Sequence, residues 1–514
     1  MYCVRSAWIL IRKLVASEAR WPALTSPWPG KRGRPTPRSG KMATVAVVLL
    51  LCLAEQGLGA EGGHLLKASS TSGDLVRVTV AIEVGGDLKL NDAGKKVSRL
   101  PLKVTGNLLY DEKVIEAGGG TKGSVRTVRY YHQAEAEITI DKNENKSSLD
   151  DDSRLIVFES TAGREALFSP TGPLSREQLE LVDVPGNSAL VAGLLPDKRV
   201  KVGESWKHDT TTLARLLGLE TVSKSGVKSS LREVAGGVAK LELSGKLSGA
   251  VGGVDTQLNL KAKYSFNLSR RRITWLAMSI GETRSIGHAA PGFEVVARLR
   301  MLISPLPEAG PLKDDALAGV PLRAKAGTAL LAFESRAGGY QLLHDRRWRV
   351  ISNQGNVTVM RLVDRGELVA QCNISRLPDL PAGKQVQLLE LHQNIQKSLG
   401  KHFGQFVEAS QAKTDAGLRV LRVVAEGVVS ELPIRWTYYL FSNETGRRTA
   451  AVFTLEGRLI ERFNEADQAL VSGFQFLDRP QTDTEQPSTA ARKQPAKTVV
   501  LPNPPTVKRR IRRR

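Results

Sequence analysis

Hydrophobic and polar side chains alternate with a period of two through much of residues 74–303. In the first such run, Val76, Val78 and Val80 are separated by Arg77 and Thr79. The pattern returns in residues 128–140, where Arg129 and Tyr131 are expected on the wet face, and in residues 258–268 and 293–301. Successive side chains of a strand point to opposite faces, so this alternation is typical of strands with one buried and one wet face. The region therefore predicts long antiparallel strands packed on one side of a core.

Few helices interrupt these strands. A capping-box pattern begins at Ser175 and predicts one short helix, and residues 211–217 predict another. Residues 195–206 predict a turn leading to an edge strand, and a division near residue 185 separates two halves that add strands to one curved sheet or half-barrel. Such a half-barrel resembles envelope proteins that carry a lipid or lipoprotein in a β-sheet cradle. A packed core is the favoured interpretation, because an alternating strand needs only one buried face, and a hollow cradle is the alternative.

Residues 338–478 mix strand patterns with one amphipathic helix. From Ala382 onward, Leu388, Leu391, Ile395 and Leu399 recur at spacings of three and four, which predicts a helix with one buried face. A short helix capped by Asn464 is predicted over residues 465–471. Strands, paired as an antiparallel meander, are predicted at 339–343, 356–362, 368–374, 418–426, 432–441, 449–455 and 474–477.

The layout of this region resembles the PsbP-like family, which includes extrinsic subunits of photosystem II. The resemblance is carried by Tyr340-Gln341-Leu342 running into residues 345–350, by the single long helix, and by the ending at residues 466–474. It implies an α/β/α sandwich with an antiparallel sheet that serves assembly or interaction and not catalysis. No metal ligands of the family can be matched position by position, so the resemblance implies no metal site.

These patterns together predict an α+β chain with a mainly antiparallel N-terminal region and a PsbP-like C-terminal domain. The predicted divisions are a signal region at 1–60, a β-rich domain at 61–305, a Pro- and Gly-bearing linker at 306–326, the PsbP-like domain at 327–478, and a disordered basic tail at 479–514.

An apolar run at residues 43–54 follows Lys41 and precedes the small residues of 57–60. This order of a basic, an apolar and a small-residue segment is that of a secretory signal peptide, with cleavage after Ala60 and a true start at Met42. The alternatives are a long basic leader or an uncleaved anchor. We therefore expect an exported protein, either periplasmic or secreted.

The net charge of +22 is concentrated at the two ends of the chain. Residues 1–41 and residues 479–514 each carry +8, which leaves only +6 for the rest, so no nucleic-acid-binding domain is predicted. The tail either remains solvated or binds an anionic wall polymer or lipid head groups. Its terminal basic residues are Lys508, Arg509, Arg510, Arg512, Arg513 and Arg514.

Sequence motifs for catalysis are missing: the chain has no G-x-S-x-G, H-E-x-x-H or C-x-x-C segment. Cys372 is the only cysteine that remains after cleavage, and its strand context predicts a buried thiol. The alternative is a nucleophile with His392 or His402 as its base. We predict no enzyme and no catalytic, cofactor-binding or metal-binding residue.

Two further stretches could carry chemistry. Residues 141–152 place oxygen-bearing side chains at calcium-loop spacing, but Lys146 stands where the loop needs glycine, so a solvated hairpin is favoured. The glycine-rich residues 118–124 predict a hairpin loop, and His132 is expected in the core.

The chain is therefore predicted to be an exported, non-catalytic binding or assembly protein of the cell envelope. The alternative is a β-sheet carrier of an apolar ligand such as a lipid or lipoprotein.

Overall fold

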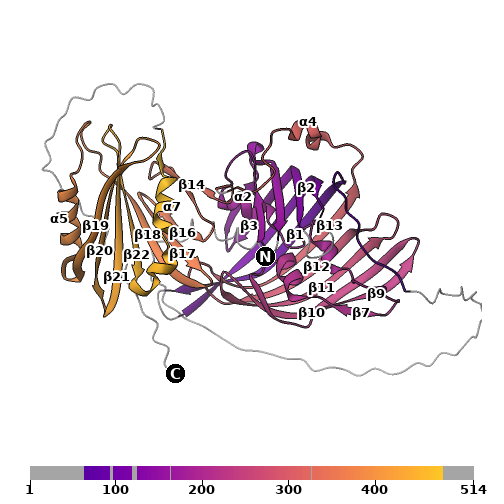
Figure 1. Cartoon of the computed structure of the whole chain (residues 1–514). Coiled ribbons are helices and arrows are strands. Elements are labelled where there is room, and N and C mark those ends of the chain that lie inside the picture. Colours follow the sequence, from indigo (N-terminus) through magenta and orange to yellow (C-terminus); the bar gives the residue numbers. More distant parts are fainter. Residues whose placement is uncertain (1–62, 93–95, 118–123, 162–163, 326, 479–514) are drawn as a thin grey trace, which may run out of the picture.

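The computed structural model describes residues 63–92, 96–117, 124–161, 164–325 and 327–478. Strands account for 56% of the structure and helices for 14%, and the strands form three sheets (Figure 1). Because antiparallel strands dominate, the predicted α+β class is wrong. The expected signal peptide, the glycine-rich loop at 118–123 and the basic tail lie outside the described residues.

The largest sheet has 13 strands in the order β6-β5-β3-β2-β1-β13-β12-β11-β10-β9-β7, with β4 paired to β3 and β8 paired to β10. The first and last strands of this region meet at its centre, where Val76 pairs with Pro305. Strands from both sides of residue 185 thus belong to one sheet. The strand bounds are β1 (Leu75–Asp92), β2 (Lys96–Glu116), β3 (Val125–Ile140), β4 (Asn143–Ser148), β5 (Leu155–Thr161), β6 (Arg164–Phe168), β7 (Ser205–Lys207), β8 (Thr221–Ser225), β9 (Lys228–Ala235), β10 (Val238–Val251), β11 (Val254–Asn267), β12 (Arg272–Arg284) and β13 (Gly292–Pro305).

One face of this sheet, called the inner face here, carries the alternating apolar residues of the main core, among them Val78, Ile138 and Leu260. Helices α2 (Arg176–Val182) and α3 (Thr210–Leu217) and the 3₁₀ turn η2 (Val191–Leu194) contribute side chains to the same core. The two predicted helices are confirmed, and the capping box at Ser175 is present. We call the opposite, polar face the outer face.

A β-bulge in β3 changes the alternation on which the prediction rested. Tyr110 of β2 pairs with Tyr131, whereas the preceding Leu109 pairs with Gln133, so His132 has no partner across the strands. The extra residue places Arg129 and Tyr131, which were expected on the wet face, in buried positions. His132 is half-buried and its Nε2 lies 2.7 Å from Asp111, so its predicted place in the core is wrong.

The C-terminal region has a seven-stranded sheet in the order β16-β17-β18-β22-β21-β20-β19 and a three-stranded sheet in the order β14-β15-β23. The predicted simple meander is wrong, because β18 pairs with β22. The strand bounds are β14 (Leu331–Ser335), β15 (Tyr340–His344), β16 (Trp348–Gln354), β17 (Val357–Asp364), β18 (Glu367–Leu377), β19 (Phe403–Lys413), β20 (Arg419–Val429), β21 (Leu432–Ser442), β22 (Arg448–Glu456) and β23 (Gln475–Phe476).

Helices contribute little to the C-terminal region. Helix α5 (Leu388–Leu399) buries three residues against one face of the seven-stranded sheet, and it starts later than predicted because residues 381–384 form a turn. The short helices α6 (Ile460–Phe463) and α7 (Ala466–Ser472) pack on the other face. Asn464 ends α6 and does not cap α7. Single short helices do not form complete layers, so the predicted α/β/α sandwich is wrong.

Contacts join the large sheet to the C-terminal region. Arg176 donates to the carbonyl of Arg346 at 2.7 Å, and Ser175 forms an isolated bridge with Ala332. The expected linker contains η3 (Gly310–Leu312) and α4 (Asp314–Leu317), whose leucines are buried beside Val128. Among the described residues, no helix combines the length and apolarity needed to cross a bilayer.

Candidate functional site

A cavity of about 990 Å³ opens on the inner face of the large sheet. It lies between strands of both halves and the segment that runs from Ser188 through η2 to Asp197. Strand β1 contributes Val76, while β12 and β13 contribute Ile273 and Ile303. The chain segments on either side of residue 185 therefore build the cavity together.

A little more than half of the cavity wall is apolar. The strand residues Val76, Val114 and Ile273 line the cavity together with Leu190 and Val191 of the segment at η2. Apolar walls with a few polar groups are usual in sites for small organic ligands, and the volume is within the ordinary range of such sites. The wall therefore offers both apolar and polar surface, which suits a ligand that has an apolar part and a polar part.

Cationic groups lie along part of the cavity lining. Arg272 forms an ion pair with Asp74 at 2.7 Å, and its neighbour Arg271 donates from Nε to the carbonyl of Lys67 at 3.3 Å. Arg271 and Lys67 are exposed, and Arg271 has a φ of 51° in the turn between β11 and β12. These side chains can meet the polar end of a ligand whose apolar part lies deeper.

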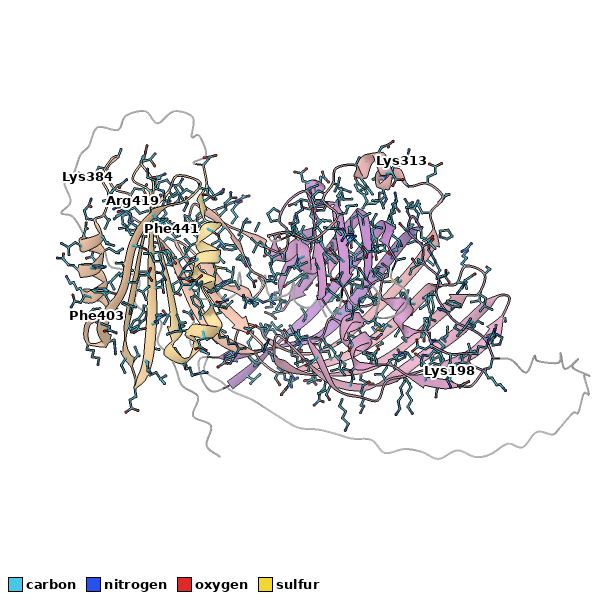
Figure 2. All side chains as sticks on the ribbon, viewed as in Figure 1. Lys198, Lys313, Lys384, Phe403, Arg419 and Phe441 are labelled. Atoms are coloured by element: carbon cyan, nitrogen blue, oxygen red, sulfur yellow. The ribbon has the colours of Figure 1, made fainter. Side chains whose placement is uncertain are left out.

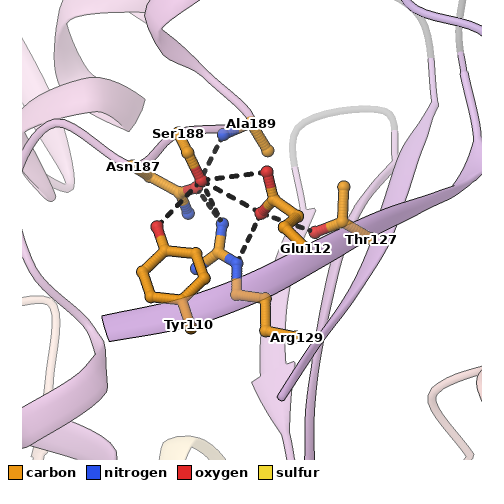
Figure 3. Close-up of polar contacts among 7 residues, drawn as sticks. All are labelled: Tyr110, Glu112, Thr127, Arg129, Asn187, Ser188 and Ala189. Atoms are coloured by element: carbon orange, nitrogen blue, oxygen red, sulfur yellow. Dashed lines mark hydrogen bonds and ion pairs between the residues drawn. The ribbon is translucent and has the colours of Figure 1, made fainter. Parts of the chain in front are cut away.

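A buried polar cluster forms another part of the wall (Figure 3). Glu112 of β2 accepts from Arg129 Nε at 2.6 Å and from Thr127 Oγ1 at 3.2 Å. Ser188 donates to Glu112 and accepts from Arg129 at 3.2 Å. The hydroxyls of Tyr110 and Ser188 lie 2.9 Å apart, so a tyrosine also joins the cluster.

This cluster holds full charges away from water. The side chains of Arg129 and Glu112 are 3% and 5% exposed. Burial is the largest effect and lowers the pKa of Arg129, but the charge and hydrogen bond of Glu112 and the nearby tyrosines together outweigh it. The net pKa is raised, so the guanidinium stays charged. Burial raises the pKa of Tyr110, which stays neutral. The cluster satisfies its own hydrogen bonds and ties the segment at residue 188 to the sheet.

The structure separates Cys372 from its candidate bases. Cys372 belongs to the core on the α7 side of the C-terminal sheet, while His392 of α5 stacks on Phe406 on the opposite side. His402 hydrogen-bonds the carbonyl of Val428. Burial raises the pKa of the Cys372 thiol well above its usual value, so the alternative of an activated nucleophile is wrong.

The candidate calcium loop is a hairpin between β3 and β4, with Asp141 at its turn. Lys146 lies within 4.0 Å of Glu137 and 3.7 Å of Glu144. Across the ranges that the structure describes, no group of three or more His, Cys, Asp or Glu side chains is arranged to hold a metal ion.

The residues of the buried cluster were not predicted from the sequence. Strict alternation assigned Arg129 to water, and only the bulge at His132 turns it inward. One signal was available: the tripeptide Arg129-Tyr130-Tyr131 faces Tyr110-Asp111-Glu112, a density of charged and aromatic residues that is unusual for paired strands with an ordinary wet face.

No family model matches the chain, and no curated protein matches it. Among solved structures, it is similar to cyanobacterial PsbP from Synechocystis sp. PCC 6803, with 16% identity and a TM-score of 0.24 over 30% of this chain and 99% of that chain. A protein of Bacteroides thetaiotaomicron is 9% identical, with a TM-score of 0.22 over 29% of this chain and 48% of that one. A structure of lipovitellin with its lipid–protein interactions is 8% identical, with a TM-score of 0.28; the match covers 65% of this chain and 32% of the lipovitellin chain. The chain thus has weak structural similarity to PsbP and to a lipid-binding protein.

Proposed function

We propose that the chain is a non-catalytic binding protein that carries a largely apolar ligand, such as a lipid, in the cavity of the large sheet. The observation that carries this proposal is the cavity itself, which has a volume of about 990 Å³ and a wall that is a little more than half apolar. Elsewhere on the inner face, side chains fill the main core, so the proposal rests on the part of that face that lines the cavity.

The lining also supports an orientation for the ligand. Hydrocarbon gains about 25 cal/mol for each Å² removed from water, so an acyl-like chain is best placed against Val76, Val114 and Ile273. An anionic or polar end is best placed beside the exposed Lys67 and Arg271. The ion pair of Arg129 with Glu112 is already satisfied, so the cluster shapes the cavity and leaves ligand charge to these exposed cations.

The test is native mass spectrometry of the full chain purified from its own host and again after incubation with vesicles of defined phospholipids. We expect a retained adduct of lipid mass. The variant Ala68→Trp adds a large side chain to the cavity wall and lowers occupancy, whereas Ala337→Trp, at an exposed turn, does not. A chain without any lipid adduct in both preparations contradicts the proposal.

A second candidate function is protein assembly through the C-terminal region, which we also propose to be a PsbP-like domain. Strand β19 is an edge strand of the seven-stranded sheet, paired only to β20, and most of its side chains are exposed. Such an edge can accept a strand from a partner. Crosslinking from a residue replaced by cysteine in β19, such as Gln411→Cys, captures a partner if this candidate is correct; the same change at exposed Glu431 serves as the control.

Export and the partner of the basic tail belong to the same proposal. A lipid carrier of the cell envelope, periplasmic or secreted, requires cleavage near Ala60, and its tail from Lys508 to Arg514 meets anionic wall polymer or lipid head groups. The intact mass of the mature chain tests export, because retention of residues 1–60 contradicts it.

A further inference from the structure

The outer face of the large sheet has a shallow groove of about 660 Å³ that crosses strands β9 to β13. Its floor runs along β12, where the outward side chains of Ala277 and Ser279 are small, and Gly281 continues the row. The neighbouring strands β11 and β13 carry long side chains on the same face, so the floor is recessed between two ridges.

Both ridges are cationic. The pairing register places Lys263 and Arg300 on either side of Ala277, and Lys261 and Arg298 on either side of Ser279. Residues two apart on one strand are spaced by about 7 Å, and strands separated by one neighbour by about 10 Å. The four charges therefore form two facing pairs across a narrow trough.

The wider rim strengthens the positive potential. Lys228 and Arg232 of β9 also line the groove, and the acidic residue among its lining is Glu242. Glu242 pairs with Arg232 at 2.8 Å and with Lys263 at 3.7 Å.

Four cations of the groove are left without such a partner. Among the residues that the structure places, Lys228, Lys261, Arg298 and Arg300 form no ion pair, although Glu83 stands across from Arg298 on β1. Unpaired cations gathered in one groove attract a polyanion.

An aromatic ring stands in line with the floor. Trp275 is the next outward residue of β12 beyond Ala277 and is 37% exposed, with Leu302 beside it on β13 at 49%. An exposed indole on a sheet buries little of its surface against the rest of the protein. It therefore offers a flat apolar face on which another ring can stack.

We propose that this groove binds an acidic polysaccharide, with its carboxylates between the facing cations and one sugar ring on Trp275. A flat bilayer cannot reach the recessed floor beneath Arg298 and Lys261. Single-stranded nucleic acid is bound by several stacking rings in succession, and this floor presents Trp275 followed by Ala277 and Ser279. The groove lies on the face opposite the cavity, so it adds a second function to lipid carriage.

The test uses the full chain and an oligogalacturonate of defined length, with affinity measured by isothermal titration calorimetry at low and high NaCl. We expect measurable binding that weakens about tenfold or more as salt screens the charges. The double variant Arg298→Glu/Arg300→Glu weakens binding at least tenfold at low salt. The matched control Lys103→Glu/Lys384→Glu changes the total charge equally at exposed positions outside the groove and leaves affinity within about twofold (Figure 2 labels Lys384).

Three outcomes overturn the proposal. The first is an equal loss in both double variants, which assigns binding to overall charge or to the basic tail that both retain. The second is binding of inorganic polyphosphate, a short single-stranded DNA or anionic vesicles as tight as that of the oligogalacturonate. The third is unchanged oligogalacturonate affinity in Trp275→Ala, for which we expect a loss of about fivefold with native circular dichroism. None of these outcomes bears on the lipid adduct.

Discussion

The two large sheets use their buried faces in different ways. In the C-terminal sheet, aromatic rings pack closely against one another. The ring centroids of Phe441 and Phe474 are 4.0 Å apart in a stacked pair, and those of Trp348 and Phe453 are 5.7 Å apart in an edge-on pair. Figure 2 marks Phe441 and Phe403, which belong to the cores on opposite faces of that sheet. In the N-terminal sheet, part of the inner face instead borders a cavity and a buried ion pair. Similar strand patterns thus support a core without such a cavity in one region and a packed core that borders a cavity in the other.

The largest effect is expected at the ion pair beside the cavity. Arg129→Ala leaves the carboxylate of Glu112 buried without its partner, which costs about 3 to 5 kcal/mol of unfolding free energy. Urea unfolding followed by circular dichroism measures the loss, with the exposed Arg298→Ala as control. A loss of less than about 1 kcal/mol would show that water reaches the cluster through the cavity.

Acid weakens both regions through buried neutral histidines. Burial lowers the pKa of the half-buried His208, which directly follows β7, and of the buried His344 in the C-terminal region to about 4, from an ordinary value of 6.5. Below pH 6.5 the unfolded chain takes up these protons first, so stability falls as the pH drops towards 4, by on the order of 3 kcal/mol for the deeply buried His344.

Unfolding free energies from pH 7 to pH 4 measure this dependence. We expect His344→Gln to reduce the change of unfolding free energy with pH, whatever its effect on stability at neutral pH. Gln393→Ala on α5 is the control, because it replaces a side chain that does not titrate. An unchanged slope in His344→Gln means that this ring is hydrated in the folded protein.

One substitution made in two places distinguishes a filled part of a core from the wall of the cavity. Ala451→Leu adds atoms to a filled core where Ala451 is 1% exposed, and we expect a loss of about 1 to 3 kcal/mol. Ala68→Leu adds the same atoms to the cavity wall and changes stability by less than about 1 kcal/mol. Thermal unfolding of both variants checks this, and equal losses would mean that the cavity closes in solution.

The smallest expected effect is at Cys372. The thiol is fully buried and its pKa is raised, so iodoacetamide at pH 8 leaves the folded chain unmodified and alkylates it in urea. Intact mass reports the modification. Rapid alkylation of the folded chain would mean that the C-terminal core opens often enough for the reagent to reach the thiol.

The sequence predicted the strands whose buried faces follow a strict period, such as β1, β11 and β13, because alternation is a local signal. It missed β19, whose side chains are mostly exposed and carry no alternation. The pairing of β18 with β22 was also missed, since pairing between distant strands leaves no local pattern. The buried cluster depends on one unpaired residue, His132, and the cavity depends on where the segment from Ser188 to Asp197 lies against the sheet. Neither the cluster nor the cavity can be predicted from the alternation of apolar and polar residues.

The pairing of β1 with β13 has a consequence for synthesis on the ribosome. Val76 can pair with Pro305 only after Pro305 has been synthesised. At about 5 to 20 residues translated per second, this takes roughly ten seconds or more after Val76 is made. During that interval the long β1 strand, with Val78 and Val80 facing inward, is an open edge available to other nascent chains. One edge of β1 therefore stays unpaired until β13, its last neighbour in the sheet, has been made.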